Sequence, residues 1–505
     1  MPSYSYILNS SKERCEKMAR TNKFGTPATR AQPDKTNFEG APAFSGTLKM
    51  DTMSALMTGS TCDTFYAGKE SQFESFSKIF AQMAKTDPKW FAKAILFARK
   101  EGFQRAIPIY ALAHLSVEST DLFKSIYADV VRNPQDAKNF LDILRSGRVR
   151  GIGRSIKSEI NAQIGRLTPY DAIKYPKNVE DMINLARPKE TINKSVIDYI
   201  KKGELGDNEV FNALKALPNA DSMSRYMAIK DFNLPYESVT SQVGNDAMAW
   251  KALYEIAPHF NLVRNLRNFI EKGVAEKDVG ERILKHKEGA MLFPFRYFQA
   301  YKAVEDISGN RDAVSLAKNA LNTCIDMSVN KLPDYNGRIV VGVDSSGSMT
   351  SATTNESMSA SEVANLFGTM MSKRYKAPII SFAESVKGIY TYRKGSILES
   401  ARRLPNAAGG TSLASPIQMM IDKDVEMDLF LGFTDNEEWC NGRFLEAWRT
   451  YRRKYPKAQA VLVQLIPTKS FPTPPKEPGV RYVYGWSEQV LQFCFTDMEQ
   501  IVNKL

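Results

Sequence analysis

Three oxygen-bearing side chains follow one apolar segment of the chain at alternate positions. Residues 338–343 are rich in Ile and Val, so this segment is expected to form a strand that is buried on both faces. Directly after it stand Asp344, Ser346 and Ser348. Gly347 lets the turn fold back tightly, so that one carboxylate and two hydroxyl groups can converge on one point. Small, hard oxygen ligands at the carboxyl end of a strand suit Mg²⁺, which prefers octahedral oxygen coordination.

Two later stretches carry oxygen ligands of the same kind. Thr411 follows two glycines and precedes a helical pattern, which places its hydroxyl group at the start of a helix. Asp435 follows a second apolar strand, predicted over 428–434. In a doubly wound sheet the carboxyl ends of parallel strands lie along one edge, so the three loops can meet there. The sequence therefore predicts a five-oxygen site for a divalent cation, with ordinary strand-capping turns as the alternative.

The length and composition indicate a globular protein with more than one domain. A chain of 505 residues corresponds to roughly three domains of ordinary size, or to fewer large ones. No run approaches the roughly 18 consecutive apolar residues of a membrane span, and the N-terminus lacks the pattern of a signal peptide. We therefore expect a cytoplasmic protein without a membrane partner. The five cysteines are scattered and include no C-x-x-C pair, which predicts free thiols and no zinc site.

The net charge of +12 is unevenly distributed along the chain. Residues 336–505 carry 20 basic and 17 acidic side chains, so most of the positive excess precedes them. Such an excess favours a polyanion such as nucleic acid as the partner of the N-terminal portion. Charge alone is equally consistent with simple solubility.

Three segments of different character follow one another. Residues 1–45 are polar and interrupted by prolines, which indicates an extended arm instead of a packed element. Over 46–335 the apolar residues recur at helical spacing, as at Phe73, Phe76 and Phe80, and short turns separate the predicted helices. This helical domain is expected to stack helix pairs as in a solenoid, with an irregular bundle as the alternative. Over 336–505 strands and helices alternate, which predicts an α/β domain with a doubly wound sheet.

A basic cluster lies in the helical domain, and no acidic residue interrupts it. Its members are Arg145, Arg148, Arg150, Arg154 and Lys157. Interspersed glycines would let the backbone approach phosphates, and a helix can begin near Gly153. Further along, Lys174 lies near Tyr170 and Tyr175, which could stack on unpaired bases, and Arg187 follows. Each charge alone could be a solvated surface group, whereas the cluster as a unit favours a polyanion.

With both halves considered, the chain resembles the Ro autoantigen family, in which a TROVE module is joined to a von Willebrand factor A domain. The resemblance extends from about Thr36 to the end of the chain. It rests on residues 37–43, 64–66, 151–157, 293–296 and 320–349. Residues 186–189 resemble a segment in which the family usually has His where Arg187 stands. The five predicted cation ligands are similar, in order and in flanking strands, to the metal-ion-dependent adhesion site of A domains.

The resemblance implies an all-α ring of HEAT-like helical repeats followed by a Rossmann-like A domain, and RNA binding without catalysis. Family members hold small noncoding Y RNAs on the outer surface of the ring and pass single-stranded 3′ ends of defective RNAs through it. Bacterial relatives cooperate with the exonuclease polynucleotide phosphorylase in RNA decay. By resemblance, Lys174 and Arg187 are expected on the outer RNA-binding face. Arg148, Arg150, Arg154 and Lys157 are expected near that face or near the hole.

Two other functions stay open at this point. One is a metal-dependent adhesion scaffold, in which a partner protein donates a carboxylate to the cation and RNA affinity is incidental. The other is a metal-dependent RNA hydrolase, because Glu437 and Glu438 follow the third ligand loop closely. The absence of a neighbouring His or Lys base in the sequence speaks against the hydrolase.

Overall fold

The computed structural model describes residues 32–504 except 60–67, 150, 205, 286–293, 355–357, 393–394, 487–488 and 497. Most of the predicted arm and Arg150 therefore lie outside the described residues. The helices of the helical domain are α2 (Leu48–Thr58), α3 (Lys69–Thr86), α4 (Pro88–Lys100), α5 (Ala106–Glu118), α6 (Thr120–Val130), α7 (Pro134–Arg145), α8 (Arg154–Gly165), α9 (Pro169–Lys174), α10 (Pro176–Ala186), α11 (Lys194–Lys202), α12 (Glu209–Ala216), α13 (Ser222–Asp231), α14 (Tyr236–Val243), α15 (Ala247–Ile256), α16 (His259–Arg264), α17 (Leu266–Glu271), α18 (Val279–Lys285), α19 (Pro294–Glu305) and α20 (Arg311–Ser328).

Local capping determines where several of these helices begin. Asp87 accepts a hydrogen bond of 3.1 Å from the backbone N–H of Trp90, and Pro88 occupies the first helical position of α4, which confirms the predicted start. Asn133 caps α7 in the same way, again followed by a proline. Asp87 also ends α3, so this one residue separates two helices.

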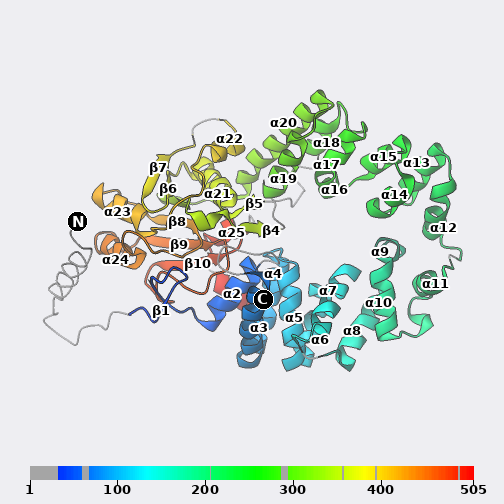
Figure 1. Ribbon diagram of the computed structural model, residues 1–505, viewed down its shortest axis with the longest axis horizontal. Helices are drawn as coiled ribbons and strands as arrows, with labels where there is room; N and C mark the ends of the chain where they lie inside the picture. Colours follow the sequence, from blue (N-terminus) through cyan, green and yellow to red (C-terminus); the bar gives the residue numbers. More distant parts are fainter. Residues whose placement is uncertain are drawn as a thin grey trace, which may run out of the picture.

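The helices follow a curved path that leaves the α/β domain and returns to it (Figure 1). Neighbours pack as pairs, such as α3 with α5, α8 with α10 and α13 with α15. Aromatic rings fill the space between them; the Phe123 and Phe140 rings of α6 and α7 stack with centroids 5.8 Å apart. The stacked arrangement confirms the helical-repeat prediction over the irregular bundle.

The α/β domain is built on a six-stranded sheet. Its strands are β3 (Ile339–Asp344), β6 (Ile379–Phe382), β7 (Val386–Tyr390), β8 (Leu429–Thr434), β9 (Gln459–Gln464) and β10 (Val480–Tyr484), in the spatial order β10-β9-β8-β3-β6-β7. All neighbours are parallel except β7, which pairs antiparallel with β6 at the edge. Its helices are α21 (Ala360–Tyr375), α22 (Ile397–Arg402), α23 (Ala414–Asp422), α24 (Phe444–Lys454), α25 (Gln489–Phe493) and α26 (Met498–Lys504). The doubly wound sheet is therefore as predicted, with β3 and β8 at its centre.

Alternate residues of the central strand β3 enter two different apolar cores. Val341 and Val343 face a core that includes α21 and continues into the helical domain. Val340 faces a separate core that contains Phe444 and Trp448 of α24. A strand whose side chains are buried on both faces reads as a continuous apolar run, which explains why the sequence pattern identified it.

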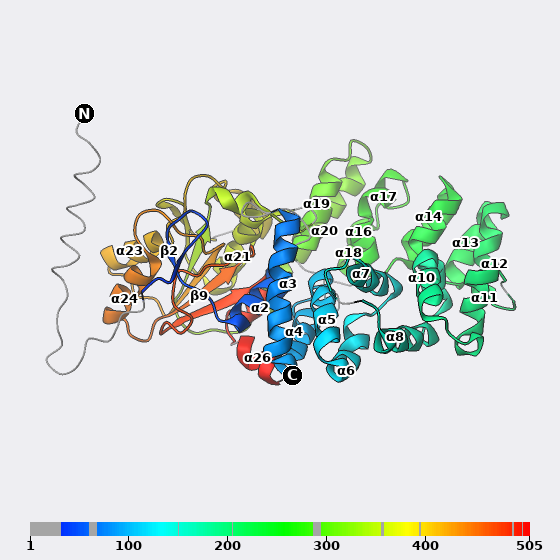
Figure 2. The same cartoon turned by 60° about the horizontal axis from the view of Figure 1, so that its bottom comes forward.

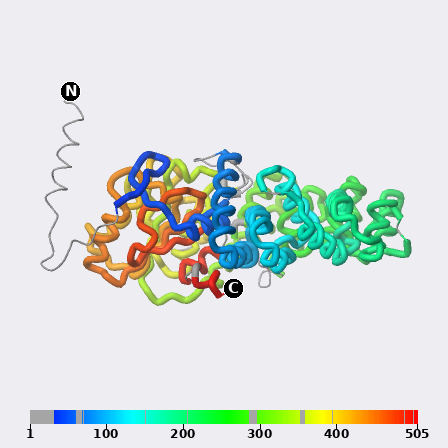
Figure 3. Tube along the Cα trace, turned by 90° about the horizontal axis from the view of Figure 1, so that it is seen from below, coloured from blue at the N-terminus to red at the C-terminus, as the bar shows by residue number. Residues whose placement is uncertain are grey.

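The described part of the N-terminal arm is packed on the α/β domain, whereas the sequence predicted an extended arm instead of a packed element. β1 (Lys35–Thr36) and β2 (Pro42–Ala43) form a small hairpin, and Phe44 pairs with Phe471 through two backbone hydrogen bonds of 3.0 Å. Figure 3 shows this segment lying across the α/β domain. The Phe44 and Phe471 side chains are buried, so the hydrophobic effect holds the arm in place.

The α/β domain contacts both ends of the helical arc and so closes the ring. At one end, α26 lies beside α4 (Figure 2), where the Lys93 ammonium donates a hydrogen bond of 2.9 Å to the carbonyl oxygen of Asn503. At the other end, Arg402 of α22 pairs with Glu305 of α19 at 3.1 Å. Within the described residues, no helix is long and apolar enough to cross a membrane.

Candidate metal site and basic surface

Hydrogen bonds between loops bring the predicted cation ligands together at the carboxyl edge of the sheet. The backbone N–H of Gly347, in the first loop, donates to the carbonyl oxygen of Gly409 in the second loop at 2.8 Å. The carbonyl oxygen of Thr411 accepts hydrogen bonds of 3.0 Å from the backbone N–H groups of both Trp439 and Cys440, which follow the third loop. The hydroxyl of Ser348 donates directly to the Asp435 carboxylate. The three loops therefore meet, as the parallel topology requires.

Five oxygen-bearing side chains of the three loops are buried at this edge of the sheet. Asp344 and Asp435 are completely buried, and Ser346, Ser348 and Thr411 are at most 7% exposed. The Ser346 and Ser348 hydroxyl oxygens lie 3.2 Å apart. Two carboxylates and three hydroxyl groups form a donor set of the hard type that Mg²⁺ accepts.

The electrostatics of the cluster favour a cation. Burial raises the pKa of Asp344 to about 7, and the negative charge of Asp435 contributes to this rise. A divalent cation between the two carboxylates would stabilise the ionised form of Asp344 in this dry site. The residues present therefore fit a divalent metal, which would be held by Asp344, Ser346, Ser348, Thr411 and Asp435.

One residue that orients the first ligand, Thr434, was missed in the sequence. The Thr434 hydroxyl donates a hydrogen bond of 2.7 Å to Oδ2 of Asp344, and the Ser346 backbone N–H donates one of 2.9 Å to Oδ1. Ser345 turns away from the cluster and donates from its hydroxyl to the Phe382 carbonyl at 2.9 Å. Thr434 directly precedes Asp435, so a polar residue at the end of an apolar strand was the signal that could have identified it.

The two glutamates that kept a hydrolase open have structural partners. Glu437 accepts a hydrogen bond of 3.0 Å from the backbone N–H of Phe38 and another from the Ser470 hydroxyl. Both carboxylate oxygens of Glu438 accept from the backbone N–H of Phe444, at 3.1 and 2.9 Å, where α24 begins. Burial raises the pKa of Glu437 to about 7 and that of Glu438 to about 8. Both residues anchor loops, which accounts for their burial without a catalytic role.

Part of the predicted basic cluster is neutralised by carboxylates. Arg145 forms a bidentate pair with Asp181, with N–O distances of 2.6 and 2.9 Å. Arg148 pairs with Glu70 and lies 5.5 Å from the centre of the Phe73 ring, so it joins the loop after α7 to α3. These two arginines connect helices, which reduces the charge they can offer to a polyanion.

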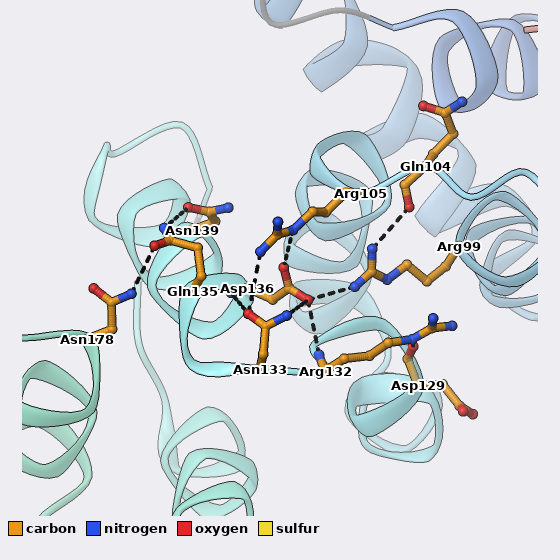
Figure 4. A network of polar contacts seen from close by, with 10 residues as sticks. All are labelled: Arg99, Gln104, Arg105, Asp129, Arg132, Asn133, Gln135, Asp136, Asn139 and Asn178. Carbon is orange, nitrogen blue, oxygen red and sulfur yellow. Dashed lines mark hydrogen bonds and ion pairs between the residues drawn. The ribbon is translucent and has the colours of Figure 1, made fainter. Parts of the chain in front are cut away.

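A buried network elsewhere uses arginines in the same way. Asp136 is completely buried and accepts from Arg99 at 2.6 Å and from Arg105 at 2.7 Å, with Asn133 adding a third donor at 3.2 Å (Figure 4). Burial lowers the pKa of Arg99. Through this network Asp136 ties α4, α5 and α7 together, so these arginines serve the fold.

Three other members of the predicted basic set remain exposed. Arg154 and Lys157 lie on the first turn of α8, and Arg187 ends α10 with a left-handed backbone (φ 50°). No described carboxylate forms an ion pair with any of the three. Asn161, one turn after Lys157 on the same helix face, reaches the carbonyl oxygen of Ala186 at 3.4 Å, which brings Arg187 close to α8. We call Arg154, Lys157 and Arg187 the cationic row.

Lys174 is neither fully exposed nor fully paired with a carboxylate. Its ammonium lies 3.7 Å from Glu237 and 5.7 and 5.5 Å from the ring centres of Tyr170 and Tyr175. Its side chain is 22% exposed. The predicted pairing of this lysine with two tyrosines is therefore present, although Glu237 partly compensates the charge.

Two comparisons with known proteins bear on this architecture. Residues 338–494 match the family model described as the Ro60 vWA domain. The chain is also similar to the crystal structure of the Ro (RSR) protein of Deinococcus radiodurans, with a TM-score of 0.65 and 18% sequence identity over 89% of this chain and 99% of that one. A likeness at this level of identity shows a shared fold over both halves.

The fold and the loop cluster define a ring of helical repeats that carries a von Willebrand A domain. The chain therefore has the fold of a bacterial Ro protein, and its α/β domain matches the Ro60 vWA domain. This confirms the fold class and the resemblance found in the sequence.

Proposed function

We propose that this chain is the RNA-binding component of a ribonucleoprotein and has no catalytic activity. Its helical ring holds a small noncoding RNA of the Y type on the outer surface and takes up single-stranded 3′ ends of misfolded or decaying RNAs. The protein acts in cytoplasmic RNA quality control or decay. Polynucleotide phosphorylase is the proposed partner in decay, recruited through the bound RNA.

The cationic row carries this proposal. Two exposed cations on the first turn of α8 and one directly after α10 have no acidic ion-pair partner among the described residues, and the Asn161–Ala186 hydrogen bond joins the two segments. Gly153 precedes α8 and makes no side-chain cap, so the first N–H groups of this helix remain available to phosphate oxygens. Arginine suits bidentate phosphate contacts, and the half-exposed ring of Tyr170 near Lys174 can stack on an unpaired base.

A gel-shift titration of the full-length chain tests the row. The double variant Arg154→Glu with Lys157→Glu is expected to weaken binding of a structured small RNA at least about tenfold, because two contacts become repulsive. The matched control is Lys423→Glu with Lys457→Glu, an equal charge change at exposed positions of the α/β domain. Unchanged RNA affinity in the first variant, or equal losses in both, would discredit the row as the RNA contact.

Salt dependence supplies an independent measurement. For single-stranded RNA, log affinity should fall with log salt concentration by a slope of about −0.7 per phosphate contacted. Replacing Arg154 and Lys157 by Ala should make that slope shallower by about 1.4, since two contacts are removed. A shift in affinity without any change of slope would mean that the row acts through the fold instead of through phosphates.

We propose Mg²⁺ as the ion of the α/β domain. When bound there, a divalent cation offers a free coordination position to an anionic group of a partner. The donor set and its burial support this assignment, and a protein ligand that donates a carboxylate is the proposed occupant. A metal-dependent adhesion scaffold with incidental RNA affinity is the alternative function; in that case RNA affinity would not depend on the cationic row.

A further inference from the structure

The candidate metal site has a rim that comes from three distant parts of the chain. Trp439 follows the third ligand loop, and its indole lies on Gly410, the residue before Thr411. A Cβ at Gly410 would lie only 2.6 Å from Cζ2 of this indole, which shows how closely the ring covers the second loop. Trp439 nevertheless remains 49% exposed. One side of the metal site is therefore bordered by an accessible indole.

The N-terminal arm supplies a second part of the rim. The backbone N–H of Phe38 donates a hydrogen bond to Glu437, which stands two residues after the ligand Asp435. The Phe38 side chain is 60% exposed. The next residue, Glu39, is also exposed and directly follows this bond to the third ligand loop. The arm thus brings an exposed aromatic residue and an exposed carboxylate beside the third ligand loop.

Glu384, after β6, completes the rim with a second carboxylate. Its Oε1 accepts a hydrogen bond of 3.2 Å from the backbone N–H of Gly410, and its carbonyl oxygen accepts one of 2.7 Å from the Asn441 side chain. These bonds fix an exposed carboxylate one residue from the ligand Thr411. A Cβ at Gly409 would lie 3.3 Å from Oε1 of Glu384, and one at Gly410 would lie 2.5 Å from Sγ of Cys440, so the Glu384 carboxylate borders the same loop that Trp439 and Cys440 cover.

We propose that this rim, formed by Phe38, Glu39, Glu384 and Trp439, selects a protein partner that offers a carboxylate to the cation and a lysine or arginine beside it. The inference rests on the proposed divalent ion at the site. The ion attracts one carboxylate, whereas the two rim carboxylates repel further negative charge. A neighbouring cation removes that repulsion and can also lie over the exposed indole.

Charge complementarity favours a protein over RNA at this face. A nucleic acid brings one negative charge per nucleotide, so phosphates on either side of the coordinated one would meet Glu39 and Glu384. A protein segment can alternate the sign of its charges over neighbouring residues. The RNA-binding cations described above belong to the helical domain, so the two partners would occupy different surfaces.

Three short fluorescein-labelled peptides test the proposal on the full-length chain in Mg²⁺. Each carries one aspartate in a Gly/Ser background, flanked by lysine, serine or glutamate. By fluorescence anisotropy the lysine peptide should bind about fivefold more tightly than the serine peptide, which is the effect of one exposed ion pair or cation–π interaction. The glutamate peptide should bind most weakly. Equal affinities, or tightest binding of the glutamate peptide, would overturn the proposal.

Variants assign the preference to the rim. Glu39→Gln with Glu384→Gln should abolish the advantage of lysine over serine while the serine peptide still binds, and Trp439→Ala should reduce the lysine advantage. The matched control, Asp422→Asn with Glu101→Gln, removes two exposed carboxylates elsewhere and should preserve the ranking. If the rim variant keeps the full lysine preference, the proposal is wrong.

The outcome is separable from that of the proposed function. If Asp344→Ala abolishes a Mg²⁺ response but no peptide binds the parent protein, the rim proposal fails and the metal assignment stands. If a single-stranded oligoribonucleotide displaces the lysine peptide from the parent protein and itself loses affinity in Asp344→Ala, the face binds RNA and the proposal is overturned. Loss of RNA binding in the cationic-row variant with an intact peptide ranking supports both proposals as separate surfaces.

Discussion

The side-chain amide of Asn37 donates a hydrogen bond of 2.7 Å to the carbonyl oxygen of Glu438, which lies 401 positions further along the chain. The side-chain oxygen of Asn37 accepts from the backbone N–H of Ala41 at 2.8 Å, which shapes the turn between β1 and β2. One buried amide therefore folds the arm and attaches it to the third ligand loop. The segment that precedes the helical domain is in this way part of the support of the candidate metal site.

Replacing Asn37 by Ala should destabilise the chain by about 1–3 kcal/mol, because the buried carbonyl of Glu438 loses its donor. Urea unfolding followed by circular dichroism measures this change. Glu39→Ala, two residues away at an exposed position, is the control and should change the free energy of unfolding by less than about 0.5 kcal/mol. Equal effects of the two substitutions would show that the Asn37 bond does not hold the arm.

Asp344→Ala should remove stabilisation by Mg²⁺. For the parent chain, a Mg²⁺ concentration of about 100 times Kd should add about 2.7 kcal/mol to the free energy of unfolding relative to chelated protein. The variant should melt at the same temperature with and without Mg²⁺. Asp422→Ala, at an exposed end of α23, should keep the full response. A persistent Mg²⁺ response in Asp344→Ala would remove this residue from the ligand set.

Glu438 should make stability depend on pH. Burial raises the pKa of its carboxyl from 4.5 to about 8, so the folded chain keeps a proton that the unfolded chain releases. The stabilisation from this group is complete below pH 4.5 and is lost as the pH rises to about 8. Glu438→Gln remains neutral and can still accept the hydrogen bond from Phe444.

The difference in unfolding free energy between the parent chain and Glu438→Gln isolates this effect from other titrating groups. This difference is measured by urea unfolding in the presence of chelator. As the pH rises across that range, the parent chain should lose a few kcal/mol of unfolding free energy relative to Glu438→Gln. A difference that stays constant with pH would mean that Glu438 is ionised in the folded protein.

Asp136→Ala should be among the most destabilising substitutions in the helical domain. It leaves Arg99 buried without its carboxylate, and breaking a buried pair typically costs about 3–5 kcal/mol. Asp142→Ala, which removes an exposed pair with Lys138 on the same helix, should cost at most about 1 kcal/mol. Thermal unfolding of both variants measures the contrast, and similar melting temperatures would argue against the network as a structural tie.

Local patterns in the sequence were sufficient for the elements that position the site. The apolar runs of β3 and β8 are buried on both faces, so their composition alone indicated central strands. Asp87 and Pro88 marked the start of α4 because capping depends on neighbours in the chain. In contrast, β7 was not predicted. Its side chains are half buried or exposed, so this edge strand does not need the continuous apolar run that identifies a central strand.

The sequence by itself determined which residues carry oxygen and charge, and on which predicted elements they stand. Only the tertiary structure decided which charges are available: Arg148 pairs with Glu70, 78 positions away, whereas Arg154 and Lys157 remain exposed. It also decided that residues near Asn37 border the third ligand loop, where the sequence indicated a free arm. The physical reason is that capping and hydrophobic periodicity act between neighbours in the chain, whereas ion pairing and desolvation depend on which distant segments pack together.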